Sequence, residues 1–425
     1  MNVIKRNGQE VVFDKKKIVN AISKAFEELN YPKNVYFEIA KNISEYVSNL
    51  KVDYLTVETI QDIVEHKLME TSYKNVAKAY ITYRHLHKLA RDKYQELMKA
   101  VAIKLQAQDV KNQNANVDEY SFGGRIGEAS SVITKKYALD YIVSPMARAN
   151  HENNEIYIHD LDSYCVGSHN CLSIPFDDLL ANGFNTRQTD IRPAQSVNTA
   201  FQLMAVIFQL QSLQQFGGVS ATHVDWTLVP YVRKSFWKHY QDGIEYCESC
   251  RIKDILPSVE TVGIECELYK EHYPKAYKYA IEMTEKEVNQ AVEGMYHNLN
   301  TLQSRSGNQL PFTSINYGTC TLPEGRMITK SLLETSIKGI GRLHKTSIFP
   351  CGIFQCMKGV NRKKGDPNYD LFKLALRSTS QRLYPNYANV DWSGNAGYEI
   401  NDPKTYFSTM GKRKLSSCKI LMNLA

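Results

Sequence analysis

Residues 156–162 read Ile-Tyr-Ile-His-Asp-Leu-Asp, and residues 168–173 read Ser-His-Asn-Cys-Leu-Ser. The two segments hold two histidines, two aspartates, an asparagine and a cysteine, bounded by β-branched and apolar residues. That composition predicts a strand that carries polar groups into a buried site, rather than a solvated loop. A cysteine held there is a candidate for thiol or radical chemistry, which makes Cys171 the first candidate catalytic residue.

The bulk composition predicts a globular chain of two or three domains, since its 425 residues are 43% hydrophobic and 23% charged. The nine cysteines are irregularly spaced, and the polar start, residues 1–6, lacks the features of a signal peptide. Reduced thiols and a cytoplasmic location are therefore expected. Glutamines interrupt the most apolar helical run, residues 201–216, so no segment is expected to span a membrane.

The net charge of +7 does not by itself indicate a nucleic-acid partner. Four basic residues lie within the last 14 positions, namely Lys412, Arg413, Lys414 and Lys419, and without them the net charge is +3. A balance of that size is ordinary for a chain of this length, so no nucleic-acid binding is expected.

Residues 1–92 have the pattern of a small, complete unit. Asn7-Gly8 lies between two short apolar runs and predicts a β-hairpin with positive φ at both turn residues. Asp14 is placed to cap a helix whose apolar residues repeat at helical spacing. That apolar face comprises Ile18, Ile22, Ala25, Phe26 and Leu29. Three further helices are expected over 36–50, 56–69 and 75–89.

Basic residues gather where this hairpin meets the first helix. Lys5 and Arg6 lie at the mouth of the hairpin, and residues 15–17, all lysine, begin the helix. Together with a helix N-terminus they can surround a polyphosphate. Composition alone favours the other interpretation, a solvated basic turn. The chain lacks a Gly-x-x-x-x-Gly-Lys-Ser/Thr loop, so hydrolysis at a P-loop is not indicated.

A family resemblance favours the polyphosphate site over the solvated basic turn. The matching motifs are Val3-Ile4-Lys5-Arg6-Asn7-Gly8, Phe13-Asp14, Lys17-Ile18, Ala77-Lys78-Ala79-Tyr80 and Tyr83-Arg84. In order and spacing they resemble the ATP-cone, the regulatory nucleotide-binding module at the N-terminus of many ribonucleotide reductases. The resemblance implies that ATP or dATP binds to residues 1–92 as an allosteric on/off signal. It makes Lys5, Arg6 and Lys17 phosphate contacts and adds Val3 and Arg84 to the nucleotide site.

The rest of the chain predicts an α/β domain. The helical pattern continues to residue 108 and gives way to a polar run at 109–116, so residues 93–120 are expected to be a link. A second domain begins near Ser121, with helices that alternate with short strands. The helices are expected over 132–150, 198–214, 226–240 and 273–302, and the strands over 156–159, 312–317 and 348–355. This alternation favours a barrel or a doubly wound sheet.

Motifs spread over the second domain resemble the catalytic subunit of the anaerobic, class III, ribonucleoside-triphosphate reductases. They are residues 157–162, 170–172, 215–218, 312–316, 365–371, 382–385 and 408–411. The family fold is a ten-stranded α/β barrel whose finger loop carries a cysteine into the barrel centre. Residues 121–411 are therefore expected to form an incomplete reductase barrel.

The chemistry of that family gives roles to the opening segment. A thiyl radical removes the ribose 3′-hydrogen, and a second cysteine donates hydrogen as the 2′-hydroxyl leaves as water. The resemblance makes Cys171 this reducing cysteine, while His159 and Asn170 help to hold the ribose. Composition alone favours a small buried hydrophobe for Cys171, and a core histidine satisfied by Asp160 is an equally good interpretation of His159.

The resemblance also implies cofactors and partners. In the family a glycyl radical generates the thiyl, formate is the usual reductant, a radical-SAM enzyme installs the radical, and the enzyme is a homodimer. The substrates are ribonucleoside triphosphates. A zinc site is also expected in the family, but the Cys247-x-x-Cys250 pair is too weak a signal to predict a metal here. Cys351 and Cys356 are expected in the core, and Cys320 at the end of a strand.

The chain departs from the family after Gly411. The family pattern Met-Gly-Cys-Arg places the thiyl cysteine there, whereas this chain has Lys412, and a lysine cannot form a thiyl. Residues 412–425 are expected to be a divergent, frameshifted tail, without the glycyl-radical loop or the zinc site. The chain is thus expected to be an incomplete reductase that is inactive alone but still binds ATP or dATP. The alternative is a non-catalytic ATP-cone regulatory or interaction protein.

Overall fold

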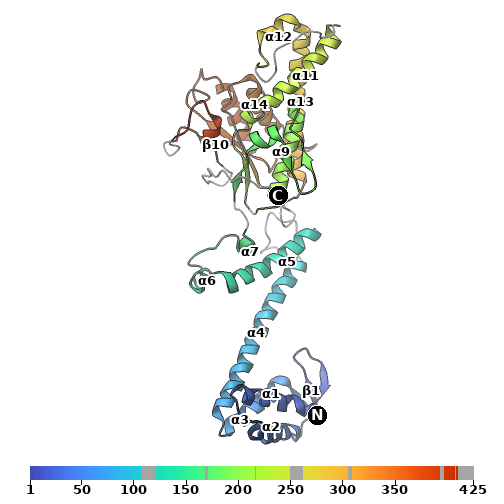
Figure 1. Ribbon diagram of the computed structural model, residues 1–425, viewed down its shortest axis with the longest axis vertical. Helices are drawn as coiled ribbons and strands as arrows, with labels where there is room; N and C mark the ends of the chain where they lie inside the picture. Colours follow the sequence, from blue (N-terminus) through green and yellow to red (C-terminus); the bar gives the residue numbers. More distant parts are fainter. Residues whose placement is uncertain are drawn as a thin grey trace. The chain divides into compact units, whose positions relative to one another are not determined.

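The computed structural model describes residues 1–106, 121–167, 171–215, 217–248, 262–304, 309–392, 397–406 and 408–409. The chain forms two compact units, Met1–Ala100 and Val101–Ala425, which are described separately below (Figure 1).

Unit 1 combines a three-stranded sheet with four helices. In order, its elements are β1 (Asn2–Ile4), β2 (Glu10–Val12), α1 (Lys15–Glu28), α2 (Lys33–Ser48), β3 (Tyr54–Thr56), α3 (Val57–Glu70) and α4 (Lys74–Gln106). The predicted hairpin and the four predicted helices are confirmed. Strand β3 was not predicted, and it pairs in parallel with β1, in the order β2-β1-β3. Of the two predicted turn residues only Gly8 has a positive φ, +81°. Gly8 N–H bonds back to the Lys5 carbonyl, so the two central residues of the turn are Arg6 and Asn7 rather than Asn7 and Gly8.

The predicted apolar face of α1 is confirmed for all but one residue. Asp14 caps the helix by accepting a hydrogen bond from Lys16 N–H, as predicted. Ile22 and Phe26 are completely buried, and the Phe26 ring contacts three tyrosine rings, those of Tyr31, Tyr36 and Tyr73. Leu29 follows the last helical residue and is 38% exposed, so it lies outside the core.

Unit 2 is an α/β unit. Its elements are α5 (Phe122–Tyr137), η2 (Ala138–Ile142), α6 (Pro145–Glu152), α7 (Leu161–Tyr164), β4 (Leu172–Ser173), α8 (Phe176–Asn182), β5 (Phe184–Asn185), β6 (Asp190–Ile191), α9 (Val197–Ser212), β7 (Val219–Ala221), α10 (Val224–Thr227), α11 (Val229–Cys247), α12 (Glu267–His272), α13 (Pro274–Thr301), β8 (Thr313–Tyr317), α14 (Pro323–Lys338), β9 (Cys351–Cys356), α15 (Tyr369–Arg382), β10 (Asn386–Asn389) and η3 (Pro403–Thr405).

Five parallel strands form the centre of unit 2, in the order β10-β9-β8-β7-β4. The predicted α/β class is confirmed, and a parallel five-stranded sheet is what part of the expected barrel requires. Strands β8 and β9 are buried along almost their whole length, because helices cover them. The core runs from α9 and α13 through the sheet to α14 and α15. Among the described residues, no helix combines the length and apolar character needed to cross a membrane.

The strand predicted over residues 156–159 is wrong. These residues form a turn and an irregular segment that leads into α7. Asn154 and Asp160 bracket the segment with φ of +60° and +56°, a left-handed conformation that a strand excludes. Ile158 N–H bonds to His151 Nδ1 rather than to a neighbouring strand, and Tyr157 is 79% exposed. The composition of this segment, which was interpreted as that of a strand, therefore belongs to an irregular segment.

The helix predicted over residues 132–150 is also divided. α5 ends at Tyr137, a π-helical turn follows, and α6 begins at Pro145. Pro145 lacks the amide hydrogen that a continuous helix needs, and Ser144 caps the new helix by accepting a bond from Ala147 N–H.

Candidate functional site

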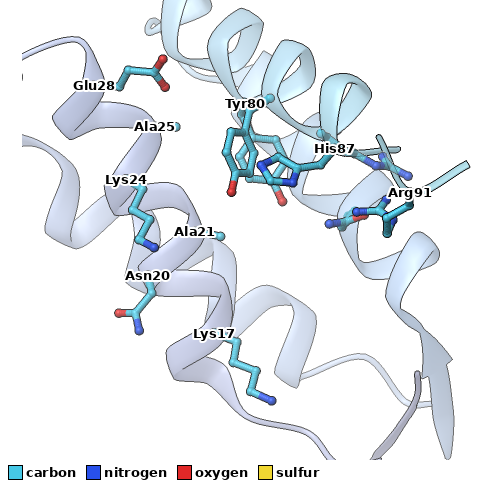
Figure 2. A pocket seen from close by; sticks show the side chains of 12 residues that line it. Lys17, Asn20, Ala21, Lys24, Ala25, Glu28, Tyr80, His87 and Arg91 are labelled. Carbon is cyan, nitrogen blue, oxygen red and sulfur yellow. The ribbon is translucent and has the colours of Figure 1, made fainter. Parts of the chain in front are cut away.

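Unit 1 contains a cavity of about 410 Å³ between α1 and α4 (Figure 2). One wall is the face of α1 that carries Lys17, Asn20, Ala21, Lys24, Ala25 and Glu28. The opposite wall is the face of α4 that carries Tyr80, Tyr83, Arg84, His87 and Arg91, and Gln61 reaches in from α3. A volume of this size is within the range of small-molecule sites.

The walls of this cavity are strongly basic. Two lysines, Lys17 and Lys24, lie on α1, and two arginines, Arg84 and Arg91, lie on α4, while Glu28 is the one carboxylate among the lining residues. Arg84 is partly neutralised, because its Nη1 lies 2.7 Å from Asp62 and 2.9 Å from Glu65 on α3. The remaining positive charge suits a ligand that carries several negative charges.

Aromatic side chains line the same cavity on the α4 side. The rings of Tyr83 and His87 pack at a centroid distance of 4.1 Å and an angle of 49°. Tyr80 is largely buried, and burial raises the pKa of its hydroxyl to about 12, so it stays neutral and presents an apolar ring. Aromatic faces bind flat heterocycles by stacking, and cations bind phosphates, so the cavity offers both parts of a nucleotide site.

The structure separates the predicted nucleotide-binding residues into two groups. Lys17 and Arg84 line the cavity. Val3 is a buried core residue, and Lys5 bonds across the hairpin turn to Gln9. Arg6 does not line the cavity but contacts a residue that does. Its guanidinium donates to Glu58 and to the side-chain oxygen of Gln61, and Gln61 lines the cavity.

Three further cationic or ionisable residues were missed from the sequence, namely Lys24, His87 and Arg91. The signal was present as helical spacing: Lys24 follows Lys17 by seven positions, and Arg84, His87 and Arg91 repeat at three and four. Such spacing places side chains on one face of a helix, but a polar helical face is usually a solvated one. Only the packing of α1 against α4 shows that these two faces line a cavity.

In unit 2, Cys171 immediately precedes strand β4 at the amino edge of the parallel sheet. Its side chain is partly exposed, and Gly218 N–H, at the start of the neighbouring strand β7, lies 3.3 Å from its sulfur. An additional Cβ at Gly218 would lie 2.8 Å from the ring of Phe312, so a larger residue does not fit there. The thiol is thus held on the sheet by a neighbouring backbone amide.

The structure does not place His159 beside Cys171 in a buried site. His159 is mostly exposed, with its Nδ1 2.5 Å from the Asp160 carboxylate. The pairing with Asp160 is the contact expected of a satisfied histidine, but the predicted burial is absent, because residues 156–160 are irregular rather than a strand. Asn170 lies outside the described residues.

The segment that precedes the departure from the family is anchored to the sheet. Asn316 on β8 donates from Nδ2 to the Thr409 carbonyl at 3.0 Å and accepts from Thr409 N–H at 3.2 Å. The same Nδ2 also bonds the Ala221 carbonyl on β7 at 3.0 Å. The sequence motif 312–316 contained Asn316, but its partner was not predictable, because the two residues are 93 positions apart. Lys412 and the tail lie outside the described residues.

A second cavity, of about 430 Å³, lies where the carboxyl end of β7 meets α8, α11 and η3. Its polar residues include Asp177, His223, Lys234, Asp402 and Lys404. His223 Nε2 lies 2.8 Å from Asp177. Burial alone would raise the pKa of the Asp177 carboxyl, but hydrogen bonds from His223 and Thr227 and the nearby Lys404 hold it below its usual value. The carboxyl edge of a parallel sheet is where α/β folds bind ligands.

The other cysteines divide by burial. Cys320 is completely buried, and burial, with the nearby Asp225, raises its thiol pKa well above the usual value. Burial also raises the pKa of Cys351 on β9, as the predicted core position implies. Cys250 lies outside the described residues, and in the part of the chain that the structure describes no three or more His, Cys, Asp or Glu residues gather as a metal site.

Alkylation should reproduce this division. Only a thiolate reacts with iodoacetamide, so we expect Cys165 and Cys171, both partly exposed, to be modified before Cys320 and Cys351 at pH 7.5 in the native protein. Mass spectrometry of digests taken over time measures the order. Equal rates for Cys320 and Cys165 in the native protein, with the same protein in urea as the unfolded control, would contradict the structure.

Two family models match separate parts of the chain. The family model described as anaerobic ribonucleoside-triphosphate reductase matches residues 113–417, and that of the ATP cone domain matches residues 1–89. The chain is 33% identical over 393 residues to the anaerobic ribonucleoside-triphosphate reductase of Haemophilus influenzae, covering 92% of this chain and 52% of the relative. It is 30% identical to that of Escherichia coli over 92% of this chain and 51% of the relative.

A phage relative and a solved structure are also similar. The reductase of Enterobacteria phage T4 is 34% identical over 65% of this chain and 42% of the relative. The crystal structure of the anaerobic ribonucleotide reductase from Thermotoga maritima in complex with dATP and CTP aligns with a TM-score of 0.45 and 13% identity, over 73% of this chain and 51% of that one.

By class, the chain therefore combines an ATP cone with an α/β unit that matches an oxidoreductase family. It belongs to the anaerobic ribonucleoside-triphosphate reductase family. It spans about half the length of the curated relatives it matches.

Proposed function

We propose that this chain acts in the anaerobic reduction of ribonucleoside triphosphates to deoxyribonucleoside triphosphates, and that unit 1 controls this activity by binding ATP or dATP. The observation that carries the proposal is the basic, aromatic-lined cavity of unit 1, which lies within the segment that matches the ATP cone. Cys171, partly exposed at the sheet edge, supports the catalytic half.

The unit 1 cavity fits a nucleoside triphosphate in charge and in shape. Lys17, Lys24 and Arg91 would neutralise the phosphates, and the ring of Tyr83 would contact the base. The side-chain oxygen of Gln61 is already bound by Arg6, so its amide hydrogens are left to donate to the ligand. The sequence lacks a Gly-rich phosphate loop, so hydrolysis at a P-loop is not indicated, and the match to the ATP cone supports a bound signal.

In the reductase reaction Cys171 would donate hydrogen at C2′ of the ribose. Its neighbour Gly218 N–H would orient the sulfur, and Asn170 would help to bind the ribose. His159 would bind the ribose only after it moves inward, since it is now exposed. The remaining family parts are proposed as partners: formate as reductant, a radical-SAM activating enzyme and a second copy of the chain. A glycyl radical would supply the radical chemistry.

Zinc is not supported in the described part of the chain, since no cluster of three potential ligands is found there. A cytoplasmic location is proposed because the nine cysteines are irregularly spaced, as expected of thiols in a reducing compartment.

The second candidate function is a non-catalytic nucleotide-responsive regulator. Lys412 favours it, because this residue stands where the family pattern has the thiyl cysteine. Formation of deoxyribonucleotide by the chain with its activating enzyme and formate would exclude the regulator.

Calorimetric titration of the full chain with Mg-ATP and Mg-dATP tests the nucleotide site shared by both candidates. We expect saturable binding of both nucleotides that inorganic phosphate alone does not reproduce, because the cavity has an aromatic wall as well as a basic one. Absence of binding by both nucleotides would refute it.

A further inference from the structure

His87 lies on the wall of the unit 1 cavity, on the same face of α4 as Arg91 (Figure 2). Arg84 lines the same wall. Its exposed imidazole packs against Tyr83 at a centroid distance of 4.1 Å. Among all side chains, the imidazole is the one whose charge ordinarily changes near neutral pH. A ligand that binds beside it can therefore change its protonation.

The groups around His87 are mainly cationic. From α1 it faces Lys17, Lys24 and the single carboxylate Glu28, and from α3 it faces the neutral Gln61. On its own helix the neighbours that line the cavity are Tyr80, Tyr83, Arg84 and Arg91, of which Arg84 is paired with Asp62 and Glu65. Without a ligand, the cavity therefore carries an excess of positive charge.

A nucleoside triphosphate reverses the local charge. It brings at least three negative charges into a cavity whose cations they then neutralise, and an opposite charge within about 4–6 Å favours the charged form of an ionisable group. We propose that His87 binds the phosphates of the nucleotide as an imidazolium, so that nucleotide binding takes up a proton. This inference rests on the proposed nucleotide site and adds a contact residue and a pH dependence to it.

The sign of the effect follows from linkage. A group that gains a proton when the ligand binds makes binding stronger at low pH. Its contribution is complete at pH values at which the group is protonated even in the free protein. The gain is lost as pH rises through the range in which the bound imidazole releases its proton. Between the titrations of the free and bound forms, affinity should fall by up to about tenfold per pH unit. Acidification would thus favour the nucleotide-bound cone.

The test is calorimetric titration of the full chain with Mg-ATP at pH 7.2, in two buffers of different ionisation enthalpy. The difference in heat gives the number of protons taken up. We expect uptake by the wild type to exceed that of H87Q by a substantial fraction of one proton, and H87Q to bind about 5- to 20-fold more weakly. In H87K, whose charge is permanent, tight binding should return without the excess uptake.

His85 provides the matched control, because it lies on α4 but does not line the cavity. H85Q should retain both the affinity and the proton uptake of the wild type. Equal proton uptake by the wild type and H87Q, with binding intact, would overturn only the proposed role of His87 and would leave the nucleotide site standing. Lack of binding by every form would overturn the nucleotide site itself and the present inference with it.

Discussion

Replacing Lys17 and Arg91 together with alanine is expected to weaken ATP binding by the full chain about 100-fold or more. The two side chains come from opposite walls of the unit 1 cavity, on α1 and α4. A hydrogen bond to a charged group contributes about 1.5–3 kcal/mol, so losing two costs at least about 3 kcal/mol, and each 1.4 kcal/mol is tenfold in affinity.

The matched control is K16A/K88A. Lys16 and Lys88 lie on the same two helices, are exposed and do not line the cavity, so the double variant has the same change in net charge. Calorimetric titration of both variants separates a direct phosphate contact from long-range attraction. If the two double variants lose affinity equally, the positive charge acts from a distance and the cavity is not the site.

Replacing Arg233 with alanine is expected to lower the free energy of unfolding of unit 2 by about 3–5 kcal/mol. Glu324 is completely buried, and its Oε1 lies 2.7 Å from Arg233 Nε and accepts a further bond from Ile264 N–H. Removing the guanidinium leaves a buried carboxylate without its cation, which is much more costly than the loss of an exposed pair.

Urea unfolding followed by tryptophan fluorescence measures this loss selectively. The three tryptophans, Trp226, Trp237 and Trp392, all lie in unit 2, so the signal does not report on unit 1. The control is K330A on α14, which removes an exposed ion pair with Glu285 and should cost at most about 1 kcal/mol. An R233A transition that overlays the K330A transition would show that the buried pair does not stabilise the sheet.

Local patterns in the sequence were sufficient to predict the four helices of unit 1, the helices α9, α11 and α13 of unit 2, and the class of the fold. The α1 face was predictable because apolar residues repeat at helical spacing and Asp14 supplies a cap. The parallel sheet was predictable as a class from the alternation of helices and strands. Strand β3 was not predicted, because three residues give too short a pattern.

The segment that first drew attention shows where pattern reading fails. Residues 156–159 alternate as a strand does, but positive φ at Asn154 and Asp160 makes the segment irregular. The two cavities were beyond prediction for a different reason. Asp177, His223 and Lys404 come together only when distant elements pack, and the α1 and α4 faces of unit 1 resemble solvated surfaces until they are opposed. Cys171 remains at the sheet edge as a candidate thiol, beside Gly218.

Photolabelling of the full chain with 8-azido-ATP tests the nucleotide site most directly. After irradiation and digestion, we predict label in peptides from residues 74–91, with lesser label in residues 15–28, and loss of label when ATP or dATP competes. Label confined to unit 2, or label in unit 1 that excess ATP does not displace, would contradict nucleotide binding in the α1–α4 cavity.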